Sequence, residues 1–92
     1  METIIQGADM KNRKRMSDME PGQKAKVLKL GIKGKMLRRI LDIGLTENTT
    51  IQCVGKSPFG DPLAYDIRGA IIAIRKEHGK NIIVETGGFR EE

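Results

Sequence analysis

The stretch KMLRRILDIG, residues 35–44, decides the fold, because its apolar residues recur with the spacing of a helix. Its charged side chains fall on the opposite arc of a helical wheel. Gly44 follows where a left-handed residue ends many helices. The pattern predicts a short amphipathic helix that docks on the rest of the protein, since isolated helices of this length are barely stable in water. Its expected core residues are Leu37, Ile40 and Leu41.

On both sides of this helix the apolar period changes to two, which is typical of strands. One such segment, residues 24–30, precedes the helix, and its pattern fits two inward faces, either Ala25 with Val27 or Leu28 with Leu30. Four more segments follow the helix, at 49–54, 63–68, 70–75 and 81–85. The segment at 70–75 is apolar on both faces, as expected of a strand that is central or covered by the helix.

About five strands with one short helix after the first predict a mainly β fold, a small and strongly bent barrel. A barrel of this size is filled by its own side chains, so we expect no ligand cavity inside it. Gly69 allows a tight turn between the third and fourth strands. Residues 76–80, KEHGK, are expected to form a connecting turn.

Ninety-two residues form one domain at most, and the net charge is +5. Four basic residues lie in KNRKR, residues 11–15, so residues 1–15 are expected to form a flexible basic tail. A basic arm for an anionic surface is the alternative. The folded domain is expected over 16–85, and 86–92 form a polar tail. No run of ~20 apolar residues predicts a membrane span, and we expect no signal peptide.

Metal binding and catalysis find no support in the sequence. The single cysteine, Cys53, and the single histidine, His78, lie on different predicted elements, and no further ligand stands at a suitable spacing. We therefore expect no metal site, no cofactor and no catalytic residues. A lone cysteine fits a reducing compartment, where Cys53 is a small buried apolar residue and His78 is solvated.

The loop SPFGDP, residues 57–62, holds two of the three prolines of the chain. Pro58 and Pro62 stiffen both ends, with Phe59 and the Asp61 carboxylate between them. Two interpretations stay open. Phe59 plugs the barrel in one, whereas in the other the loop presents an apolar side chain and a carboxylate to a partner at low entropic cost.

The charged side of the predicted helix carries Lys35, Arg38 and Arg39. It is either a solvated basic face or a docking surface for an acidic partner. The chain has only two Phe, one Tyr and no Trp, which argues against single-stranded nucleic acid, because such binding uses aromatic stacking.

Several motifs, in order and spacing, resemble the FeoA domain family: MEPGQKAKV, LRRILDIGL, PFGDPLAYDIRG, AIRKE and NIIVE. The resemblance covers about residues 16–85 and implies an SH3-like β-barrel with an inserted helix. One departure lies after the helix, where Asn48 replaces a frequent glycine. Asn tolerates a left-handed backbone better than other non-glycine residues, so we expect the turn to persist.

The resemblance implies a non-enzymatic accessory protein of ferrous-iron uptake, which contacts the cytosolic part of FeoB, a membrane permease with a cytosolic GTPase domain. It also implies a cytoplasmic location, with recruitment to the inner face of the membrane left open. We expect the partner to contact Lys35, Arg38, Arg39, Phe59 and Asp61. The alternative is a free-standing SH3-like module that contacts a transcription regulator or nucleic acid, and self-association is left open.

Overall fold

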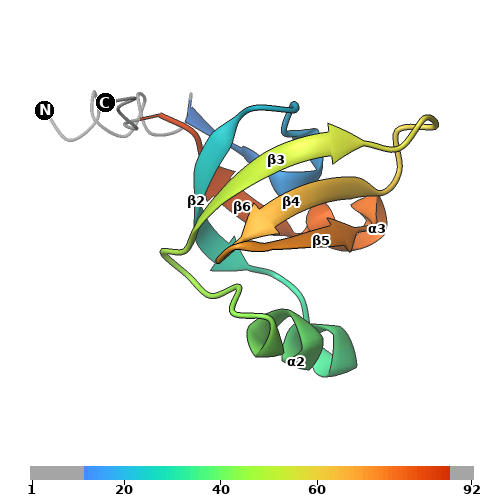
Figure 1. Cartoon of the computed structure of the whole chain (residues 1–92). Helices are drawn as coiled ribbons and strands as arrows, with labels where there is room; N and C mark the ends of the chain where they lie inside the picture. Colours follow the sequence, from blue (N-terminus) through green and yellow to red (C-terminus); the bar gives the residue numbers. More distant parts are fainter. Residues whose placement is uncertain (1–11, 88–92) are drawn as a thin grey trace, which may run out of the picture.

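The computed structural model describes residues 12–87, and in this range six strands form one antiparallel sheet in the order β1-β6-β2-β3-β4-β5 (Figure 1). The strands are β1 (Arg13–Arg15), β2 (Lys24–Leu30), β3 (Thr50–Lys56), β4 (Leu63–Ile67), β5 (Ala70–Ile74) and β6 (Ile82–Glu85). The helices are the 3-10 turn η1 (Met16–Asp18), α2 (Gly34–Asp42) and the single turn α3 (Lys76–Gly79). The fold is therefore mainly β, with the expected helix after the first long strand.

The sheet curls so that β6 lies behind β3 and β4 in Figure 1. Its end strands, β1 and β5, are not paired with each other. The short helices η1 and α3, which lie next to those end strands in the chain, contact each other instead. Gly79 is buried in this contact, where a Cβ atom would lie 3.3 Å from the backbone nitrogen of Ser17. A residue without a side chain therefore allows the two short helices to meet.

Strand β1 corrects the expected boundary of the basic tail. Residues 13–15 pair with β6, with Arg13 opposite Glu85 and Arg15 opposite Ile83. Residues 1–11, which make up the rest of the expected tail, lie outside the described residues. A strand of three basic residues has no apolar period, and its formation depends on the free edge of β6. At the other end, the Thr86 N–H donates to the Asn12 carbonyl at 2.8 Å, so the first residue of the expected polar tail still contacts the domain.

The core fills the inside of the curl with aliphatic side chains and one aromatic ring. Tyr65 is 1% exposed, and its hydroxyl donates to the Met16 carbonyl at 2.9 Å. Of the two inward faces that fitted β2, the one with Ala25 and Val27 is buried, and a register shift follows Val27. The other buried apolar residues are Met16, Met19, Ile32, Ile40, Leu45, Ile51, Cys53, Leu63, Ile67, Ile74, Ile82 and Val84.

Helix α2 docks through a narrower stripe than the wheel predicted. Ile40 is buried, and Met36 and Ile43 pack beside it, four residues before and three after. Leu37 is half-buried and also packs against the core, whereas Leu41 is 43% exposed, so the expected place of Leu41 in the core is wrong. The stripe is centred on Ile40, and the next residue is rotated about 100° away from it.

The predicted turns form, and of the two places predicted for 70–75, central or covered by the helix, the central one is wrong, whereas α2 does lie beside Ile72 and Ile74. Gly44 and Asn48 adopt φ of 92° and 73°, and Arg68 and Gly69 form the tight hairpin turn between β4 and β5. Strand β5 is an edge strand, not a central one, and its residues are mostly exposed. Residues 76–79 are also a turn of helix, α3, and not an irregular connection.

Candidate protein-binding site

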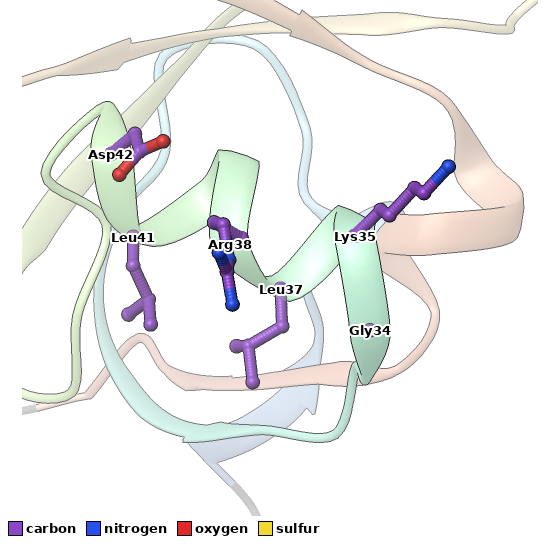
Figure 2. A pocket seen from close by; sticks show the side chains of 6 residues that line it. All are labelled: Gly34, Lys35, Leu37, Arg38, Leu41 and Asp42. Carbon is purple, nitrogen blue, oxygen red and sulfur yellow. The ribbon is translucent and has the colours of Figure 1, made fainter.

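The side of α2 that faces away from β5 carries an open hollow of about 620 Å³ beside the helix. Figure 2 shows the side chains of Leu37 and Leu41 pointing the same way, with Arg38 between them and Lys35 pointing away. The hollow is lined by Gly34, Lys35, Leu37, Arg38, Leu41 and Asp42. We call these six residues the outer face of α2. It combines one exposed and one half-buried leucine with two cations and the Asp42 carboxylate.

The electrostatics of α2 favour an acidic partner. The residue before the helix, Lys33, makes no side-chain capping hydrogen bond, and no acidic residue stands in the first turn. Lys33 and Lys35 therefore place positive charge at the end of the helix where the backbone dipole is also positive. Among residues 12–87, the ion pairs involve neither Arg38 nor Asp42. A carboxylate from a partner would relieve this repulsion.

Arg39 lies on a different side of the helix from Lys35 and Arg38. It lines a second hollow, of about 70 Å³, between α2 and β5. The apolar walls of this hollow include Met36 of the helix, Ile43 directly after it, and Ile72 of the strand. Lys35, Arg38 and Arg39, which were predicted to form one surface, therefore lie on two different surfaces.

The loop 57–62 holds Phe59 in solvent. The Phe59 side chain is 96% exposed, so it does not plug the barrel. The loop is cross-braced by backbone hydrogen bonds, from the Gly60 N–H to the Ser57 carbonyl at 2.8 Å and from the Ser57 N–H to the Pro62 carbonyl at 3.1 Å. The Ser57 hydroxyl also accepts the Asp61 N–H at 2.9 Å. These bonds restrain the backbone that carries Phe59.

The carboxylate of Asp61 has a structural partner. Its Oδ1 atom accepts the backbone N–H of Lys76 at the start of α3, at 2.9 Å. Figure 1 shows the loop between β3 and β4 well separated from α2. The five predicted contact residues therefore lie at three places: Lys35 and Arg38 on the outer face of α2, Arg39 towards β5, and Phe59 and Asp61 on the loop.

Cys53 takes the environment that the sequence predicted, whereas His78 is less solvated than expected. Cys53 is fully buried, and burial raises the pKa of its thiol. The His78 side chain is one-third exposed, with Nε2 3.4 Å from a Glu77 carboxylate oxygen. Within residues 12–87 no three His, Cys, Asp or Glu side chains are grouped as metal ligands would be. In the same range, no helix has the length and apolar character to cross a membrane.

Two features of the site were missed from the sequence. The exposure of Leu41 was not predicted, because its spacing fits the apolar arc of the helical wheel. Its place at the margin of that arc was a weak indication of exposure. The exposed edge of β5 was missed because an apolar segment reads as buried. The absence of a charge between Ala70 and Ile74 distinguished this segment from other strands, but strand order depends on the whole fold.

Comparison with known proteins assigns the family. The FeoA domain model matches residues 14–86. A "Fe(2+) transport protein A/Fe(2+) transporter FeoB fusion protein" from Porphyromonas gingivalis is 31% identical over 71 residues, which are 77% of this chain and only 8% of that protein. The NMR structure of a FeoA-like protein from Clostridium acetobutylicum is 32% identical, with a TM-score of 0.74 over 88% of this chain and 94% of that one.

The NMR structure of the FeoA protein from Chlorobium tepidum is similar in fold, with a TM-score of 0.76 at 23% identity over 84% of this chain and 73% of that one. These structures confirm the predicted class of a small, mainly β, SH3-like domain with an inserted helix. The match of the family model to most of the chain agrees with the motifs around α2 and the loop 57–62. The chain belongs to the FeoA domain family.

Proposed function

We propose that this protein is a non-enzymatic accessory of ferrous-iron uptake, which acts by contact with the cytosolic part of an FeoB permease. The observation that carries the proposal is the fusion relative, whose name joins Fe(2+) transport protein A to the transporter FeoB in one polypeptide. Two parts of one polypeptide meet at a high effective concentration, as suits partners that work together. The permease recruits this chain to the cytoplasmic side of the membrane.

The outer face of α2 is the surface that we assign to this contact. Leu37 and Leu41 supply an apolar centre, and Lys35 and Arg38 supply charge at its rim. In protein interfaces, buried apolar anchors mainly set the dissociation rate, whereas rim charges mainly set the association rate and its salt dependence. Phe59, exposed at the tip of the loop, is a second and separate contact.

The test measures binding of the full chain to the full-length FeoB permease of the same organism, purified in detergent and immobilised. Arg38→Glu should slow association, most strongly at low salt. Leu41→Ser and Phe59→Ala should speed dissociation at every salt concentration. Each variant should keep the circular dichroism spectrum of the wild type, since all three side chains are exposed.

Lys24→Glu is the matched control for Arg38→Glu, because it makes the same change of charge. Lys24 is exposed at the start of β2, and α2 follows the other end of that strand, about 20 Å away. It should bind like the wild type. A wild type that does not bind the permease contradicts the proposed function. If the two single variants Arg38→Glu and Leu41→Ser both bind normally, the assignment of the outer face of α2 is contradicted.

A further inference from the structure

Strand β5 offers unpaired backbone groups along one side. Arg68 and Gly69 form the two-residue turn from β4, so Ile67 and Ala70 are the hydrogen-bonded pair that closes the hairpin. Pairs then alternate, which directs the N–H and C=O groups of Ile71 and Ala73 away from β4. Among the described residues, β5 has no strand on that side, and no turn or loop hydrogen bond reaches these two residues.

The two edges of the sheet differ in their protection against strand addition. The edge strand β1 is Arg13–Lys14–Arg15, and charged side chains of this kind discourage pairing with another chain. The other edge, β5, reads Ala-Ile-Ile-Ala-Ile, with no charge and no proline. Its register with β4 is regular, whereas the ladders of β2 with β6 and of β3 with β4 both contain shifts. Ile71 is also 61% exposed.

A hollow of about 70 Å³ adjoins this edge, between β5 and α2. Ala73 lines it from the strand, and Met36 and Ile43 line it from the helix and the residue after it, so it has room for one small apolar side chain. Arg39 stands at the same hollow. The nearest charged residues in sequence on either side of β5, Arg68 and Arg75, are also basic.

From these features we propose that the edge of β5 binds an extended segment of the partner by strand addition. This inference rests on the proposed binding to the permease and adds a further contact to it, on the side of α2 that faces β5. The segment pairs its backbone with Ile71 and Ala73, places one apolar side chain in the hollow beside Met36, and carries carboxylates towards Arg39 and Arg75. Main-chain hydrogen bonds supply affinity in this mode of recognition, while the hollow and the charges supply specificity.

Charge favours this partner over a second copy of the chain. Antiparallel pairing of two β5 strands through Ile71 and Ala73 is centred on Ile72. It brings Arg68, in the hairpin turn of one chain, near Arg75 and Lys76 after β5 of the other, at both ends of the paired region. Like charges that are brought close together repel each other and oppose this pairing. The carboxylates of an acidic segment are attracted to these basic residues instead.

The test removes an N–H group that the fold itself does not use. Ala73→Pro deletes the outward N–H of Ala73, and proline is tolerated in an edge strand when that N–H faces solvent. Ala73→Val is the matched control, because it enlarges the side chain and keeps the N–H. Binding to the detergent-purified FeoB permease should weaken at least about tenfold for Ala73→Pro, the effect of one lost hydrogen bond of ~1.4 kcal/mol, and little for Ala73→Val.

A second variant guards against unfolding by proline. Cys53 is the single cysteine, so residues 1–52 can be ligated to a synthetic peptide of residues 53–92 that carries N-methylalanine at position 73. The unmethylated ligated chain is its control. Weak binding by the methylated chain, with an unchanged circular dichroism spectrum, supports strand addition.

The outcomes separate this inference from the proposed function. If the proline variant and the N-methyl variant both bind as tightly as the wild type, strand addition is overturned and the proposed function still stands. Equal losses in Ala73→Pro and Ala73→Val also overturn it, since side-chain volume then explains the effect. If the variants lose only a dimer seen by sedimentation, β5 pairs with a second copy and the assigned partner is wrong. No binding by the wild type overturns both proposals.

Discussion

The carboxylate of Asp61 accepts the backbone N–H of Lys76 at 2.9 Å, which joins the loop between β3 and β4 to the first turn of α3. Because α3 contacts η1 between the two end strands, this bond links the position of the loop to the closure of the sheet. The loop that displays Phe59 is therefore held from the folded domain as well as by its own hydrogen bonds.

Replacement of Asp61 should lower the free energy of unfolding, and by more when the new side chain has no acceptor oxygen for the Lys76 N–H. Asp61→Ala leaves the Lys76 N–H without this partner and should lower the free energy of unfolding by about 0.5–2 kcal/mol, as for the loss of a helix cap. Asp61→Asn keeps an acceptor oxygen and should cost less. Urea denaturation measures both. Glu47→Ala, at an exposed carboxylate in another loop, should leave the midpoint unchanged, and an equal loss there contradicts the assigned role of Asp61.

Features that depend on local backbone chemistry could be predicted from the sequence. The amphipathic run at 35–44 marked α2, and Gly44 and Asn48 marked the turns that need a positive φ. Each of these signals acts within a few residues, so it keeps its meaning whatever surrounds it. The same holds for the stiffness of the loop 57–62, which its prolines indicated.

Features that depend on the neighbours of a segment could not be predicted in this way. Strand β1 forms because β6 offers it an edge, and its own residues carry no apolar pattern. Leu41 is exposed because α2 docks through Ile40, and the shape of the barrel surface determines which side of the helix docks. The place of β5 at the edge follows from strand order, which no single segment encodes. For the same reason the predicted contact residues of α2 lie on two surfaces, since a helical wheel does not show which side of the helix faces β5.

The contrast between Ile40 and Leu41 gives a direct test of how α2 docks. Ile40 is 1% exposed, so Ile40→Ala should lower the free energy of unfolding by about 2–5 kcal/mol, through lost burial and the cavity left behind. Leu41→Ala removes a similar volume from a side chain that is 43% exposed, and should cost less than about 1 kcal/mol. Guanidinium denaturation of the two variants measures the difference. Similar losses would show that α2 docks through a wider face.

Gly44 should be the more costly of two matched glycines to replace. Gly44 and Gly22 both have a φ of 92°, so an alanine is strained by about 1–2 kcal/mol at either position. At Gly22 a Cβ atom meets no other atom within 4 Å, whereas at Gly44 it would lie 2.7 Å from Cδ of Arg68. Arg68 cannot move freely, because its Nε–H donates to the Gly44 carbonyl at 2.7 Å.

Gly44→Ala should therefore lower the thermal midpoint further than Gly22→Ala does. The pair separates the cost of the backbone conformation, which both share, from the cost of displacing Arg68. Arg68→Ala combined with Gly44→Ala removes the clash, so the further loss caused by the glycine change should shrink in that background. A further loss that stays the same would show that Arg68 does not limit the position.

Tyr65 should make stability depend on alkaline pH. Its ring is 1% exposed, and burial raises the pKa of its hydroxyl above the value of about 10 in an unfolded chain. The unfolded state therefore releases this proton first. The stabilisation is fully present below pH about 10 and is lost progressively as the pH rises from there towards the folded-state pKa. Tyrosinate absorbance reports on this residue alone, because the chain has a single Tyr.

The variant Tyr65→Phe isolates this effect from other alkaline titrations. Near neutral pH it should be less stable than the wild type by about 0.5–1.5 kcal/mol, because the Met16 carbonyl loses the hydroxyl that it accepts. Above pH about 10 the wild type must carry the rising cost of keeping the hydroxyl protonated, which the phenylalanine does not share. The stability difference, measured by urea denaturation at each pH, should then shrink and finally reverse. A constant difference, or tyrosinate formation in the folded protein at the unfolded pKa, would contradict burial of the hydroxyl as the cause.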